Sequence, residues 1–254
     1  MGTSSSHRSP STPEWERVKQ LYREPKPNPR DVASRIASAL DVPTRQEMSG
    51  PGVACCLRSL LDASARAGDG ALSALLPPGS EVAPLLAVSE AIREQAERDI
   101  ARGSFASRFA DIGLNALATA VFEVGAGGSA ELFHVDLATA VAGLASYARA
   151  GRLHQLALTF LGHDFDHLYR YLVTRDVSEF VGGPGLPTVA AASQLRDAVS
   201  QYCHQTMNAL TATVHEDALA AALRQDDEHG LVLMQDVLAD LIEQGLTRIA
   251  AAGG

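Results

Sequence analysis

Aromatic residues are scarce in this chain of 254 residues: they make up 5% of it, with a single tryptophan. The apolar content, 46% of the residues, comes mainly from alanine, leucine and valine. Alanine and leucine favour helices, whereas a β-sandwich needs more aromatic and β-branched residues. Sustained alternation of apolar and polar residues is also missing, which argues against a sheet. We therefore predict an all-α fold, an antiparallel multi-helix bundle with a flexible N-terminal arm.

Cysteine is equally sparse, with Cys55, Cys56 and Cys203 as the whole set. An odd number that includes an adjacent pair does not make a disulfide framework, so we expect a reducing, cytoplasmic setting. The first residues are polar and do not resemble a signal peptide. Apolar stretches such as residues 113–124 are too short to cross a bilayer, so we expect no membrane span.

Positive charge is lacking in most of the chain. The net charge is −9, and it is uneven: residues 1–30 carry a net +3 and the remainder a net −12. An acidic body repels phosphate backbones, so we expect the folded part to bind no nucleic acid. Residues 215–243 hold eight acidic residues and one arginine. That run is either a solvated face or a docking surface for a basic partner.

Proline and glycine divide the chain into an arm, residues 1–52, and a helical body, residues 53–254. In the arm we predict a disordered tail, a short helix over 14–23, a proline-rich linker over 24–29, a second helix over 31–40 and another linker over 43–52. Thr188 is a plausible helix N-cap, and Asp176 with Glu179 has capping-box spacing. For the body the punctuation predicts helices at about 53–67, 81–102, 105–124, 130–149, 152–174, 188–213 and 216–250, the last broken near His229.

The short helix of the arm carries the only tryptophan. Trp15, Val18 and Tyr22 fall at positions i, i+3 and i+7, which places them on one face. This spacing is typical of a helix that docks in a groove of a partner protein. The alternative is that the three side chains pack on the surface of the protein itself.

The densest polar cluster lies in residues 161–172. His163 and His167 are four residues apart, a spacing that can present two imidazoles to one metal such as zinc or iron. The spacing resembles that of hemerythrin-like and DinB-like helical metalloproteins, although no motif here matches their other ligands. By helical phase, His163 lies opposite the apolar arc and His167 at its edge, so an exposed face paired with Asp166 and Arg170 is the alternative.

A metal site would need further ligands from another helix. The available donors are Cys203, His204 and residues 215–217. Cys203 falls with apolar residues and is predicted to lie in the core, whereas His204 falls on the solvent face.

Asp164 lies within the apolar arc of the same helix. A buried carboxylate without donors is costly, so we expect it to pair with an arginine or a backbone group of a neighbouring helix. The alternative is that this arc faces a partner or a pocket.

None of these patterns carries a recognisable reaction. The sequence therefore favours a non-catalytic interaction or adaptor protein, which docks through the N-terminal helix and the acidic C-terminal surface or associates with itself as a homo-oligomer. The alternative is a helical metalloprotein or metal-dependent enzyme that uses His163 and His167.

Overall fold

Side-chain caps and prolines set where most of the helices begin. In the computed structural model, which describes residues 12–72, 76, 83–127, 135–210 and 216–251, Thr12, Asn28 and Asp41 each accept a hydrogen bond from a backbone amide of the helix that follows. Each of these helices has a proline in its first turn, where the missing N–H breaks no helical hydrogen bond. Thr188 caps a later helix, as predicted.

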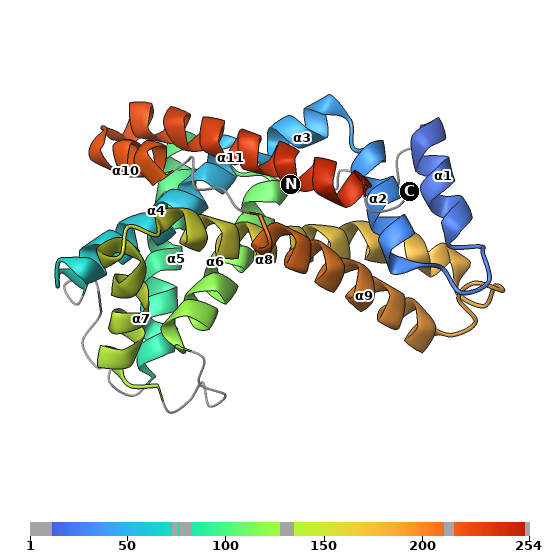
Figure 1. Cartoon of the computed structure of the whole chain (residues 1–254), viewed down its shortest axis with the longest axis horizontal. Coiled ribbons are helices and arrows are strands. Elements are labelled where there is room, and N and C mark those ends of the chain that lie inside the picture. Colours follow the sequence, from blue (N-terminus) through green and yellow to red (C-terminus); the bar gives the residue numbers. More distant parts are fainter. Residues whose placement is uncertain (1–11, 73–75, 77–82, 128–134, 211–215, 252–254) are drawn as a thin grey trace.

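The resulting helices fill most of the described chain (Figure 1). They are α1 (Pro13–Leu21), α2 (Pro29–Ala39), α3 (Val42–Met48), α4 (Pro51–Gly68), α5 (Pro84–Gly103), α6 (Arg108–Gly125), α7 (Leu137–Arg149), α8 (Leu153–Val177), α9 (Val189–Asn208), α10 (Glu216–Arg224) and α11 (Asp227–Ala251), with the 3-10 turn η3 (Ser178–Phe180) after α8. Among the described residues there is no sheet, and an isolated bridge joins Val181 to Leu186. The predicted all-α multi-helix bundle is confirmed.

Helix α8 is central to the bundle. It packs along α9 on one side and α6 on another, and it also contacts α4, α7 and α10. Neighbours on several sides explain why its buried residues are spread around the helix instead of forming one stripe. Helix α11 contacts α2, α4 and α10.

Residues 12–52 pack on the rest of the protein. Helix α1 lies on α2, and α2 contacts both α9 and α11 at one end of the molecule (Figure 1). The segment 43–52, predicted as a linker, instead contains most of α3 and the start of α4. The prediction failed because Pro43 and Pro51 stand in first helical turns, where proline is tolerated. The predicted disordered tail falls almost wholly in residues 1–11, outside the described residues.

The C-terminal break also differs from the prediction. The chain leaves the helix at residues 225–226, before His229. Asp226 Oδ1 accepts a hydrogen bond from the His229 amide at 2.9 Å, so the aspartate begins α11 as its cap.

Candidate metal centre

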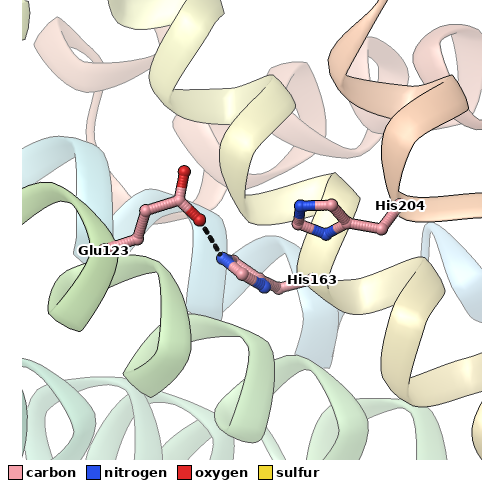
Figure 2. Close-up of side chains that lie close together, drawn as sticks. All are labelled: Glu123, His163 and His204. Carbon is pink, nitrogen blue, oxygen red and sulfur yellow. Dashed lines mark hydrogen bonds and ion pairs between the residues drawn. The ribbon is translucent and has the colours of Figure 1, made fainter. Parts of the chain in front are cut away.

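Three helices bring Glu123, His163 and His204 together. Glu123 lies near the end of α6, His163 in the middle of α8 and His204 near the end of α9 (Figure 2). One ligand atom from each of the three side chains lies within 4.8 Å of the other two. Carboxylate oxygen and imidazole nitrogen are ordinary ligands of zinc and iron, so the cluster has the composition of a metal centre.

Glycine at position 162 permits the close approach of α8 and α9. A Cβ atom at Gly162 would lie 2.5 Å from Asn208 Oδ1 and 3.2 Å from His204 Nδ1. A larger residue would therefore displace the side chains of Asn208 and His204. The absence of a side chain at this position is what lets the imidazole of His204 reach the ring of His163, with ring centroids 4.7 Å apart.

The Glu123 carboxylate and the His163 imidazole form a hydrogen bond with each other. His163 Nε2 lies 2.7 Å from Glu123 Oε2, and the His163 side chain is only 12% exposed while that of Glu123 is 50% exposed. The hydrogen bond from His163 lowers the pKa of the Glu123 carboxyl, against a smaller opposing effect of burial. Glu123 is therefore held in the anionic form that a metal ion requires.

The second imidazole has its own hydrogen-bond partner. Asn208 Nδ2 lies 2.9 Å from His204 Nε2, one helical turn further along α9. An amide can present either its nitrogen or its oxygen, so this partner suits either tautomer of the ring. Outer partners of this kind orient metal-binding histidines, and this one leaves Nδ1 as the nitrogen available to an ion.

His167 is not part of this cluster. Its Nε2 atom lies 3.3 Å from Thr119 Oγ1 on α6, one turn before Glu123, and burial lowers the pKa of its imidazole. His163 and His167 therefore contact two different residues of α6, Glu123 and Thr119, and their ring nitrogens are not directed at one common metal position. The predicted solvent-facing position of His163 is wrong, because α6 and α9 flank α8 and cover the edges of its polar face.

Part of the predicted polar face is present. Arg170 forms an ion pair with Asp166 one turn before it, at 2.9 Å, and a second with Asp197 on α9, at 2.7 Å. These pairs are partly exposed and are worth little to stability. The histidines take no part in them, since His163 pairs with Glu123 instead of Asp166.

Asp164 is buried, as predicted, with 2% of the residue exposed. The predicted pairing is wrong: its Oδ1 atom has no hydrogen-bond partner, and no ion pair reaches it from the described residues. Burial raises the pKa of this carboxyl to about 7. A group of this kind stays largely protonated in slightly acidic solution, which avoids the cost of a buried charge.

The arm helix is held in the core of its own chain. Trp15, Val18 and Tyr22 are all nearly inaccessible, at 2%, 0% and 0% exposed. Trp15 Nε1 donates a hydrogen bond of 2.6 Å to Asp176 Oδ2 on α8, and Arg175 stacks on the indole ring. Binding of a partner through these three residues stays a prediction. In this conformation their faces are covered.

Asp176 has a different role from the one its spacing suggested. It is fully buried, and besides the hydrogen bond from Trp15 its Oδ1 atom accepts one from Arg175 Nε at 2.8 Å. The predicted capping box with Glu179 is wrong, because the carboxylate faces the arm helix instead of the turn after α8.

The sequence does not predict Glu123 or Asn208 as members of this cluster. A signal for Glu123 exists: it is the only charged residue between Ile112 and Gly125, a stretch that is mostly apolar. Asn208 has no comparable signal, since a polar residue at the end of a helix is ordinary. His204, one of the available donors in the sequence, is partly buried, so its predicted solvent-facing position is wrong.

Comparison with protein-family models, curated proteins and solved structures finds no match to this chain. Within the described ranges, no helix combines the length and apolar character needed to cross a bilayer.

Proposed function

We propose that the protein binds a divalent transition metal, zinc or iron, through Glu123, His163 and His204. The observation that carries the proposal is the convergence of three ligand atoms from α6, α8 and α9 within 4.8 Å. Tetrahedral zinc with bonds of about 2 Å separates its ligand atoms by about 3.3 Å. Binding would need rotations of the three side chains that widen the 2.7 Å contact between His163 Nε2 and Glu123 Oε2 and shorten the longer separations, which lie within 4.8 Å.

The surroundings support a site that keeps an open position. Two histidines and one carboxylate are the ligand set of several catalytic zinc sites and of non-haem iron sites, which leave at least one position for water or a ligand. Glu123 is half-exposed, so the ion is reached from solvent. A closed structural site would need a fourth protein ligand, and the cluster of ligating side chains in the described residues contains three.

Metal titration with matched variants tests the proposal. Purified protein is stripped with a chelator and titrated with Zn²⁺ by calorimetry, and with Fe²⁺ under anaerobic conditions. We expect one ion per chain, and at least a tenfold loss of affinity in each of Glu123→Gln, His163→Ala and His204→Ala. His167→Ala is the control, because it removes an imidazole from the same helix outside the cluster.

Two results would contradict the proposal. One is the absence of stoichiometric binding by the wild-type protein. The other is a loss of affinity in His167→Ala that equals the loss in His163→Ala, while His204→Ala binds normally. That second pattern would favour the pair predicted from the sequence over the three-helix cluster.

The interaction function stays a prediction beside this proposal. Docking of Trp15, Val18 and Tyr22 on a partner requires α1 to leave its place on the body, with loss of the bond to Asp176. Part of the acidic C-terminal charge is also paired within the chain, since Glu243 contacts Arg45 and Glu216 contacts His154. Deletion of residues 1–30, followed by measurement of oligomeric state and pull-down partners, tests that function.

A further inference from the structure

A pocket lies beside the metal centre, between α7, α8 and the end of α9. Its volume is about 450 Å³, within the usual range for small-molecule sites. Leu158, Leu210 and Tyr147 give it apolar walls, and the polar groups come from His154, Gln155, Thr159 and Asn208. A pocket of this composition suits a small organic molecule that has both an apolar body and a polar head.

The pocket adjoins the candidate ligands. Asn208, which lines the pocket, is also the residue bonded to His204 at 2.9 Å. Thr159, which also lines the pocket, lies one helical turn before His163, so the two side chains share a face of α8 at a separation of about 6 Å. Gly162 of the same helix packs against both Asn208 and His204, since a Cβ atom there would lie 2.5 Å from Asn208 Oδ1 and 3.2 Å from His204 Nδ1.

The net charge of the metal ion and its three protein ligands determines which polar head group the small organic ligand should carry. A divalent ion bound by one carboxylate and two neutral imidazoles carries a net charge of about +1. A monoanion in the open position neutralises it, and a carboxylate is a hard oxygen ligand that both zinc and iron accept. A neutral head would leave the charge uncompensated in a partly buried site.

We propose that the centre takes a small organic carboxylate as an additional ligand, with the carboxylate on the ion and the organic body in the pocket lined by Leu158, Thr159 and Leu210. This inference rests on the metal-binding function proposed above. It adds to that function a class of ligand and the place where the ligand lies.

Substitution with cobalt allows binding of the carboxylate to the metal ion to be followed by visible absorption. Chelator-stripped protein is loaded with Co²⁺, whose visible absorption reports coordination, and titrated with acetate and with phenylacetate. Acetate supplies the carboxylate head with almost no organic body, whereas phenylacetate adds a phenyl ring as the body. We expect phenylacetate to bind about tenfold more tightly or better, because its ring leaves water for an apolar pocket.

A variant that fills the pocket distinguishes the contribution of the carboxylate head to affinity from that of the organic body. Thr159→Phe narrows the pocket without touching a ligand, so we expect it to keep its affinity for Co²⁺ and acetate and to lose the preference for phenylacetate. Thr174→Phe is the matched control: the same substitution at an exposed position of the same helix is expected to bind as wild type.

The outcomes are distinguishable. Absence of cobalt absorption refutes the proposed metal site and this inference with it. Cobalt absorption that responds to neither carboxylate refutes the inference alone. Equal affinities for the two carboxylates, unchanged in Thr159→Phe, would show that the pocket does not hold the body of the ligand, which also overturns the inference.

Discussion

Replacement of Asp164 by asparagine is expected to stabilise the protein, and more so as the pH rises. The carboxyl is 2% exposed, and its Oδ1 atom has no partner. Burial raises its pKa from 3.8 to about 7. Asparagine has nearly the same shape and never carries the charge, so the variant isolates the cost of ionising this group inside the protein.

The direction follows from the two pKa values. Below pH 3.8 both the folded and the unfolded chain hold the proton, and ionisation of the group costs no stability. Between 3.8 and 7 the unfolded chain ionises while the folded chain keeps its proton, so the free energy of unfolding falls as the pH rises. At about 1.4 kcal/mol per pH unit, the accumulated cost is about 2 kcal/mol at pH 5 and about 4 kcal/mol at pH 8.

Urea unfolding at pH 5 and pH 8 measures this cost. A chelator is present throughout, so that metal binding does not contribute. The stability of Asp164→Asn relative to wild type is expected to increase by about 2 to 3 kcal/mol between the two pH values. Asp236→Asn, which removes a negative charge from an exposed position of α11, is the control for the acidic net charge, with changes within about 0.5 kcal/mol.

A constant difference between Asp164→Asn and wild type at both pH values would refute the reasoning. It would mean that the ionised carboxylate finds a donor or water in the folded state. Asp164→Leu adds a second measurement, because leucine also removes the buried polar atoms. If burial of the charge is the cause, this variant shows the same dependence on pH.

Three further predictions follow from other contacts. The Glu216 carboxylate accepts hydrogen bonds from the first two backbone amides of α8, at 3.0 and 2.8 Å, and so caps that helix from another one. Glu216→Ala removes the cap and is expected to lower the free energy of unfolding in urea by about 1 to 2 kcal/mol. An unchanged midpoint would contradict this role. Gly162→Ala is expected to weaken zinc affinity about tenfold by displacing the side chains of Asn208 and His204. Its unfolding free energy should change by less than about 1 kcal/mol, because alanine favours the helix. Burial raises the pKa of the Cys56 and Cys203 thiols, so neither should react with a thiol reagent until denaturant is added, and rapid labelling of the native protein would show that these positions open.

The sequence predicted the helices well because their signals are local. A cap such as Thr188 depends on its own next three residues, and the burial of Asp164 follows from its angle on one helix. The failed linker at 43–52 has the same origin. Proline marks both the end of a helix and its first turn, and only the neighbouring packing distinguishes the two.

The candidate centre was only partly predictable, because it depends on how three helices cross. A helical wheel assigns each residue of α8 to core or solvent, but α6 and α9 cover the edges of that helix as well. His163 therefore meets Glu123, which is 40 residues away, and His167 turns to Thr119. No spacing within α8 contains that information.

The bond between Trp15 and Asp176, 161 residues apart, gives the protein a built-in optical reporter. Because the chain has one tryptophan, all of its indole emission comes from the arm helix. That ring is 2% exposed and lies beneath the guanidinium of Arg175, 4.8 Å from its centroid. Detachment of α1 from the body would move the emission to longer wavelengths, while circular dichroism, dominated by the remaining helices, would scarcely change. Release of the arm and unfolding of the bundle can thus be followed separately in one sample, without a label.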